Sequence, residues 1–220
     1  MASLDADIQA AGTHCTHCFR VLQPEEKIRT PSDPINAVYC SKDCEANSKS
    51  QSHNVVFSLQ SVLPSAVPTP ESITPESLEE RRKAQLQFVQ YVERERKNYP
   101  ILVTRYIARQ ITLEMAKFDP GASSAPKRKV EGDYPEADGG DYTLADHVER
   151  LRFVSQSPPK EELDLITSVL STTLPGLEQF IEDERFAILV GKMAYNTFGV
   201  CFDGGRDNRV ITFLWCLVFA

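Results

Sequence analysis

The sequence predicts a mainly α-helical protein with a small zinc-bound module near its N-terminus. Two observations support this prediction. Four of the 6 cysteines lie in two close pairs before residue 45. Most of the chain after residue 75 carries apolar residues at the three- and four-residue spacing of amphipathic helices. A chain of 220 residues, 41% of them hydrophobic, can bury one sizeable core beside a small module that needs extra stabilisation.

The spacing of the clustered cysteines is typical of a metal site. Cys15 and Cys18 form a C-x2-C pair, and Cys40 and Cys44 form a C-x3-C pair. Zinc prefers four soft ligands in a tetrahedron, and two such pairs fill every position, so the sequence predicts a structural zinc site. A redox role for the first pair is the weaker alternative, because no strand precedes it and no clear helix follows it.

Three histidines flank this cluster. We interpret His14 and His17 as loop residues beside a site that sulfur already fills. His53 is ambiguous, because a second zinc would need three further ligands that the neighbouring sequence does not offer.

Beyond the cysteines, the pattern predicts a linker followed by helices. Residues 58–75 are rich in Pro, Ser and Thr and indicate an extended linker. A helical region follows over residues 76–195, with Thr74 as the N-cap and Pro75 in the first turn of its first helix. The helices are expected at 75–97, 101–118, 143–153, 160–174 and 177–195. Residues 119–141 lack any period and indicate a disordered loop.

The character of the sequence changes after Asn196. Residues 197–202 read T-F-G-V-C-F, which predicts a strand, and Asp203-Gly204-Gly205 indicates a turn. The apolar run over residues 210–220 would span only about 16 Å as a helix, roughly half a bilayer core. We therefore expect a buried strand or an aberrant terminus there, and no membrane partner.

Charge and composition argue against some classes of partner and indicate the cellular compartment. The formal net charge of −7 argues against direct nucleic-acid binding, which needs clustered Lys and Arg. The first 12 residues lack the charged start and apolar segment of a secretory signal. We expect a nuclear or cytoplasmic protein that is not secreted. Lys127-Arg128-Lys129 is either a nuclear address or a solvated loop.

The cysteine segments resemble a MYND finger. The matching residues are C-T-H-C at 15–18 and V-Y-C-S-K-D-C at 38–44, followed by His53. The resemblance implies a finger over residues 13–57 in which the four cysteines bind the first of the family's two zinc ions. The family's middle C-x-x-C pair is absent between residues 19 and 39, and Phe57 stands at its last cysteine position. One zinc is therefore expected.

The segment G-K-M-A-Y-N-T-F-G-V at 191–200 resembles the SET-and-MYND-domain family of protein-lysine methyltransferases. This resemblance implies that residues 76–195 are an α-helical SET insert and that residues 196–220 are an incomplete segment of the SET-type β core. It also places Asn196, Tyr195 and, more weakly, His147 beside S-adenosylmethionine. A helix C-cap is the alternative role for Asn196.

Two functions follow from these resemblances. The N-H-S-C signature and the N-terminal SET strands of the family are absent, so the first is a zinc-binding fragment of such a methyltransferase that does not catalyse methyl transfer. The alternative is a zinc-dependent protein-interaction module that binds short peptides in a transcriptional or chromatin context. The expected partners are peptides or lysine-bearing proteins such as histones.

Overall fold

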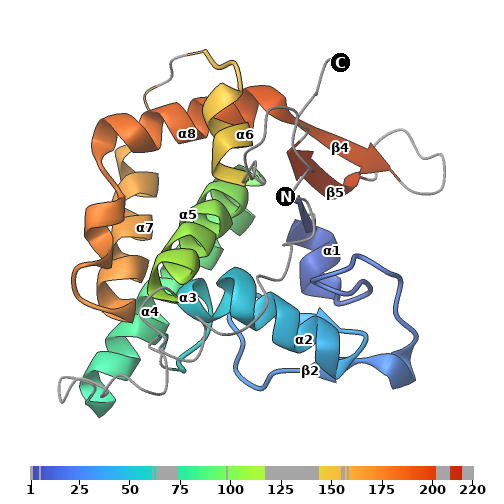
Figure 1. The fold of residues 1–220 in the computed structure, drawn as a ribbon. Coiled ribbons are helices and arrows are strands. Elements are labelled where there is room, and N and C mark those ends of the chain that lie inside the picture. Colours follow the sequence, from blue (N-terminus) through green and yellow to red (C-terminus); the bar gives the residue numbers. More distant parts are fainter. Residues whose placement is uncertain are drawn as a thin grey trace.

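Helices dominate the described part of the chain, and two small antiparallel sheets complete it (Figure 1). The structure is a computed structural model that describes residues 2–4, 6–60, 62, 74–97, 99–116, 144–154, 157, 159–201 and 209–214. The prediction of a mainly α-helical chain is confirmed. The expected loop at 119–141 and most of the expected linker at 58–75 lie outside the described residues.

Short elements make up residues 13–57, which we call the cysteine module. Helix α1 (Ala6–Ala11) precedes it, and a 3-10 turn (Pro24–Glu26) leads into strands β2 (Ile28–Arg29) and β3 (Val38–Tyr39). The two strands pair antiparallel, with Ile28 opposite Tyr39. Helix α2 (Lys42–Ser48), a π-helical turn (Lys49–His53) and α3 (Asn54–Val56) follow without a break. Together they form one helical rod that leads from the cysteines to the rest of the fold.

Five α-helices follow the module in the described part of the chain. They are α4 (Pro75–Glu95), α5 (Tyr99–Ala116), α6 (Leu144–Arg150), α7 (Lys160–Thr173) and α8 (Asp183–Asn196). Helix α4 begins as predicted, because the Thr74 hydroxyl accepts a hydrogen bond from Ser77 N–H and the Ser77 hydroxyl accepts one from Thr74 N–H. No helix in the described part of the chain combines the length and the hydropathy that a membrane span needs.

The prediction of a single helix over residues 177–195 is wrong. The chain forms a 3-10 turn (Leu177–Phe180), becomes extended at Ile181 and Glu182, and only then enters α8. Leu177 and Phe186 explain the break. Nine residues of continuous helix would point these two side chains to opposite faces, whereas the break lets both enter the same core.

The helix expected at 143–153 is shorter than predicted, because α6 ends at Arg150. Residues 151–154 instead run along α8. The Arg152 carbonyl accepts a hydrogen bond from the Asn196 amide, and the Val154 carbonyl lies so close to Gly191 that a Cβ there would approach it to 2.7 Å. Gly191 therefore permits this close approach of backbone to helix.

The two ends of the chain meet in one three-stranded sheet. Its order is β1 (Ala2–Leu4), β5 (Arg209–Leu214) and β4 (Thr197–Cys201), and both pairings are antiparallel. Leu4 lies opposite Ile211, so residues near the two ends of the sequence are direct neighbours. The strand expected after Asn196 is present as β4, whereas β1 has no counterpart among the sequence predictions.

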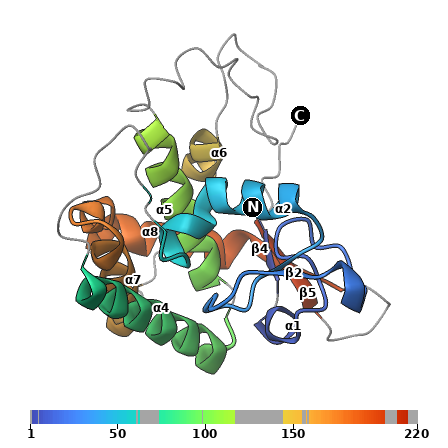
Figure 2. The same ribbon diagram turned by 90° about the horizontal axis from the view of Figure 1, so that it is seen from below.

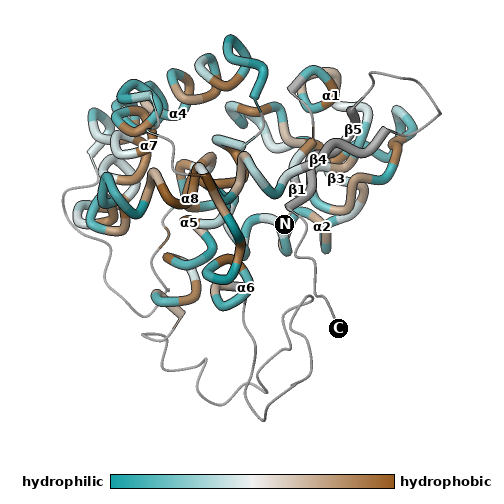
Figure 3. Tube along the Cα trace, turned by 90° about the horizontal axis from the view of Figure 1, so that it is seen from above, coloured by the Kyte–Doolittle hydropathy of each residue, from teal (hydrophilic) through white to brown (hydrophobic). Residues whose placement is uncertain are grey.

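A single hydrophobic core joins the cysteine module to the helices. In Figures 1 and 2 the module lies on one side of α5, and α4 and α7 lie on the other. Brown stretches of α5 and α8 in Figure 3 lie toward the middle of the molecule, whereas much of α4 is teal. The Phe57 ring, at the end of α3, stacks on Phe88 of α4 with the ring centroids 6.4 Å apart. The module is therefore continuous with the larger fold.

Helix α4 also binds the backbone that follows α3. The Arg81 guanidinium donates to the carbonyls of Asn54 and Gln60, at 2.9 and 3.1 Å, and the Gln85 amide donates to the Ser58 carbonyl at 3.1 Å. Burial lowers the pKa of Arg81 to about 10. These bonds pair carbonyls of α3 and of the residues after it with side chains of α4.

The contribution of this core can be measured by comparing two residues of α4. We expect Phe88→Ala to lower the free energy of unfolding by about 3–5 kcal/mol, because the ring is 0% exposed and its loss leaves a cavity. Leu86→Ala, at a residue that is 41% exposed, should cost less than about 1 kcal/mol. Urea denaturation followed by circular dichroism measures both values, and equal losses would contradict the assignment of Phe88 to the core.

Candidate metal centre

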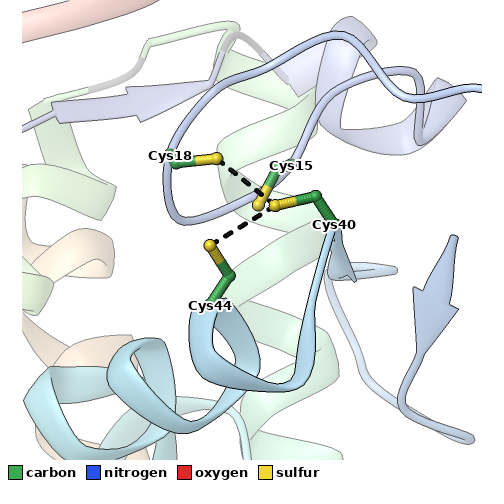
Figure 4. A group of neighbouring side chains, drawn as sticks. All are labelled: Cys15, Cys18, Cys40 and Cys44. Carbon is green, nitrogen blue, oxygen red and sulfur yellow. Dashed lines mark hydrogen bonds between the residues drawn. The ribbon is translucent and has the colours of Figure 1, made fainter. Parts of the chain in front are cut away.

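Four thiols lie close together at one end of the cysteine module (Figure 4). The sulfur atoms of Cys15, Cys18, Cys40 and Cys44 all lie within 4.8 Å of one another. Cys40 Sγ is 3.6 Å from Cys18 Sγ and 3.4 Å from Cys44 Sγ. Four sulfurs around a tetrahedral zinc ion would be about 3.8 Å apart, given a Zn–S bond of about 2.3 Å. The cluster therefore fits a metal ion such as zinc.

The first cysteine pair lies on a tight turn. Cys15 N–H donates to the Arg20 carbonyl at 2.8 Å, and Phe19 N–H donates to the Cys15 carbonyl at 2.9 Å. Phe19 has a φ of 64°, in the left-handed region that a bulky residue seldom adopts. This conformation closes the turn so that Cys15 and Cys18 direct their sulfurs to one point.

The second pair comes from the end of β3 and the first turn of α2. Cys40 follows β3 directly, and Ser41 caps α2 by accepting a hydrogen bond from Cys44 N–H at 3.1 Å. Thr16 joins the two pairs: its N–H donates to the Val38 carbonyl at 2.7 Å, and its hydroxyl accepts from Val38 N–H at 3.1 Å. The site is thus assembled by backbone contacts on both sides.

The electrostatics of the cluster favour a bound cation. Burial raises the pKa of Cys18 and brings the pKa of Cys44 to about 12, and the neighbouring thiols add to both shifts. Burial also raises the pKa of Cys15, but backbone N–H groups of Cys18, Cys40 and His17 outweigh it and leave a lowered pKa. A metal ion stabilises all the thiolates at once, so binding would release protons.

His53 has a partner that the sequence did not indicate. Its Nε2 lies 2.5 Å from Asp33 Oδ2, and both side chains are 2% exposed. The other oxygen of Asp33 accepts hydrogen bonds from the backbone N–H groups of Ile35 and Ala37. The pair fastens the loop before β3 to the helical rod. An aspartate before a proline signals a turn, but nothing local signals its pairing with a histidine twenty positions later.

The described metal cluster consists of the four cysteines, and His14 and His17 lie beside it in the sequence. His14 Nδ1 lies 2.9 Å from the Thr13 hydroxyl. His17 lies on the turn between Cys15 and Cys18 and is half-buried.

Of the residues that the SET resemblance assigns to a cofactor, Tyr195 and Asn196 end α8, and His147 lies on α6. The Asn196 side-chain amide donates to the carbonyls of Lys192 and Arg152, each at 2.7 Å. Asn196 is the last residue of α8 and Thr197 is its C-cap, and the bond to Arg152 ties α8 to the segment after α6. Tyr195 is 61% exposed, and His147 lies half-buried on α6.

Comparisons with known proteins assign no family. No protein-family model, no curated protein and no solved structure matches the chain. The resemblance to the SET-and-MYND-domain family therefore stays a prediction from the motifs, and function has to be inferred from the geometry of the site.

Metal content tests the cluster directly. We expect the intact chain to bind one equivalent of zinc and Cys18→Ser to lose it, whereas Cys201→Ser, far from the two cysteine pairs in the sequence, should keep it. Elemental analysis after gel filtration gives the stoichiometry. Because a structural metal stabilises the folded state, its removal by a chelator should lower the melting temperature by at least about 5 °C. A chelated chain with an unchanged melting temperature would contradict a structural metal.

The pair of Asp33 and His53 can be tested separately from the metal. We expect Asp33→Asn to lower the free energy of unfolding by about 2–3 kcal/mol, because it weakens a buried hydrogen bond to a charged group. Asp43→Asn, at an exposed position of α2, should cost less than about 1 kcal/mol. The double variant Asp33→Asn/His53→Gln should lose much less free energy of unfolding than the sum of the losses in the two single variants. A loss equal to that sum would show that the two side chains do not interact.

Proposed function

We propose that this chain is a zinc-stabilised protein-interaction module. The observation that supports it is the closed set of four thiols, which fills a tetrahedron and leaves no coordination position for water or substrate. A closed site of this kind stabilises a shape and does not catalyse a reaction. The expected partners are peptide segments or lysine-bearing proteins such as histones, in the nucleus or cytoplasm.

The geometry of the module favours a role in binding, because the module presents a rigid surface to a partner. Its core residues belong to the same cluster as those of α4 and α5, so the module has a fixed orientation on the helices. Val21, which follows the cysteine turn, is an apolar side chain that is 60% exposed. A rigid surface with exposed apolar groups binds partners at a low entropic cost.

A second candidate is a methyltransferase fragment of the SET-and-MYND type. The observation that favours it is the sheet formed by both ends of the chain, which the cysteine module and the helices interrupt. The family has this arrangement, with its finger and helical insert inside a SET domain. Methyl transfer needs a cofactor and a lysine amine held in line away from water, and we expect no turnover from this chain.

One pair of binding experiments separates the two candidates. A displayed library of random peptides is selected on the zinc-loaded chain, and S-adenosylmethionine is titrated into the same protein by calorimetry. The interaction module predicts an enriched peptide consensus and no heat from the cofactor. Cys18→Ser should weaken binding of the consensus peptide at least tenfold, whereas Cys201→Ser should leave it unchanged.

Two results would count against the proposal. Consensus peptides that bind the metal-free chain equally well would remove the role of zinc. Cofactor binding together with lysine methylation would establish the methyltransferase candidate instead.

A further inference from the structure

A glutamate side chain is buried where the start of α7 meets the end of α4. Glu162 lies in the first turn of α7 and is 0% exposed. Its Oε2 accepts a hydrogen bond from the Tyr91 hydroxyl of α4 at 3.1 Å. Its Oε1 is also buried and has no hydrogen-bond partner within the described part of the chain. Glutamate side chains are almost never fully buried unless they are paired, so this one is in an unusual environment.

The local sequence explains why the carboxyl of Glu162 lies between the two helices. In a capping box, a glutamate three residues after the N-cap accepts a hydrogen bond from the backbone N–H of the N-cap residue. The N-cap of α7 is Pro159, and proline has no N–H to donate. Glu162 therefore lacks the partner that its own helix end would otherwise provide, and its donor comes from α4 instead.

The preceding residue, Glu161, provides a natural comparison. Its side chain is 57% exposed, and its Oε2 lies 2.8 Å from Arg94 Nη2 of α4. Two consecutive glutamates of α7 thus contact the same end of α4, where the two helices lie side by side (Figure 2). Glu161 does so through an exposed ion pair, and Glu162 does so through a buried hydrogen bond to Tyr91.

The charged groups around Glu162 leave it without a counter-ion. No lysine or arginine among the described residues forms an ion pair with it, and Lys97, whose charge acts on it, lies 3.5 Å from Glu95 instead. The hydroxyl groups of Tyr91 and Tyr99 face the carboxyl from α4 and α5, and the charge of Glu95 repels it. Burial raises the pKa of Glu162 and outweighs the opposing effects of Tyr91, Lys97 and Tyr99.

We propose that the buried contact between Glu162 and Tyr91 is a pH-sensitive switch in the packing of α7 on α4. The neutral carboxyl stays buried against the tyrosine hydroxyl. When the carboxyl ionises, the first turn of α7 opens and water reaches the charge, because an unpaired buried charge is far more costly than a buried neutral group. The inference concerns the helical part of the chain and does not rest on the proposed interaction function.

The direction of the pH effect follows from the burial of Glu162. Because its pKa is raised in the folded chain, the folded chain holds more protons at this site than the unfolded chain. The contact therefore contributes its full stability at pH values below the ordinary pKa of glutamate. This contribution is lost as the pH rises toward the raised pKa.

Thermal unfolding of the zinc-loaded chain at pH 5 and pH 8 measures this effect. Glu162→Gln keeps the shape of the neutral carboxyl and cannot ionise. Its melting temperature relative to the unchanged chain should therefore rise by at least about 2 °C between the two pH values. For Glu161→Gln, at the exposed neighbour, the corresponding difference should change by less than about 1 °C. The comparison at each pH cancels the pH dependence of the metal cluster, which all three chains share.

Site-resolved measurements test the opening of α7. NMR titration of the Glu162 carboxyl carbon, identified by its absence from Glu162→Gln, should give a midpoint above the ordinary range of glutamate. Hydrogen exchange, corrected for the intrinsic effect of pH on its rate, should show that the amides of residues 163–167 lose protection over the same pH range. Glu162→Gln should keep this protection. Tyr91→Phe removes the hydroxyl donor and should move the midpoint further upward.

Three results would overturn the switch. A Glu162 midpoint in the ordinary range would show that the carboxyl is not buried as an unpaired group. A raised midpoint with unchanged protection of residues 163–167 would show a buried carboxyl that opens nothing. Equal changes of melting temperature in Glu162→Gln and Glu161→Gln would show an effect of net charge alone. If circular dichroism shows that Glu162→Gln does not fold, the upward shift of the midpoint in Tyr91→Phe identifies the signal and decides the test.

Discussion

Four ionisable sulfurs within 4.8 Å of one another are stable together as thiolates only around a cation, and the rest of the cysteine module is arranged around this requirement. The ion would fix the cysteine turn against the first turn of α2. Because α2 and α3 form one rod, the direction of α2 then determines where Phe57 meets Phe88. Coordination of the metal would thereby also determine how the larger core packs.

The far end of the rod is held by side chains of α4 and α7 that donate hydrogen bonds to backbone carbonyls. Arg81 binds the carbonyls of Asn54 and Gln60, and the Thr173 hydroxyl of α7 donates to the Val55 carbonyl at 2.9 Å. The rod is therefore anchored by sulfur at one end and by helix side chains at the other. Such double anchoring fixes the rod between the cysteine turn and the helices.

Local signals predicted the parts of this structure that local forces determine. The cysteine spacing located the candidate metal site, and the Thr74 cap located the start of α4 within one residue. The break at Ile181 was missed, because it follows from the need to bury residues on two faces in one core. The contact of His53 with Asp33 was missed for a related reason: nothing within either residue's neighbourhood specifies the other.

The pairing of β1 with β5 has a consequence for the order of folding. Leu4 pairs with Ile211, which is synthesised about two hundred positions later. Contacts this distant in sequence close late, because the loop entropy must be lost before they form. The cysteine module can meanwhile assemble around a metal ion from residues close together in the chain. We expect β1 to remain unpaired throughout that period and to enter its sheet only once β5 has been made.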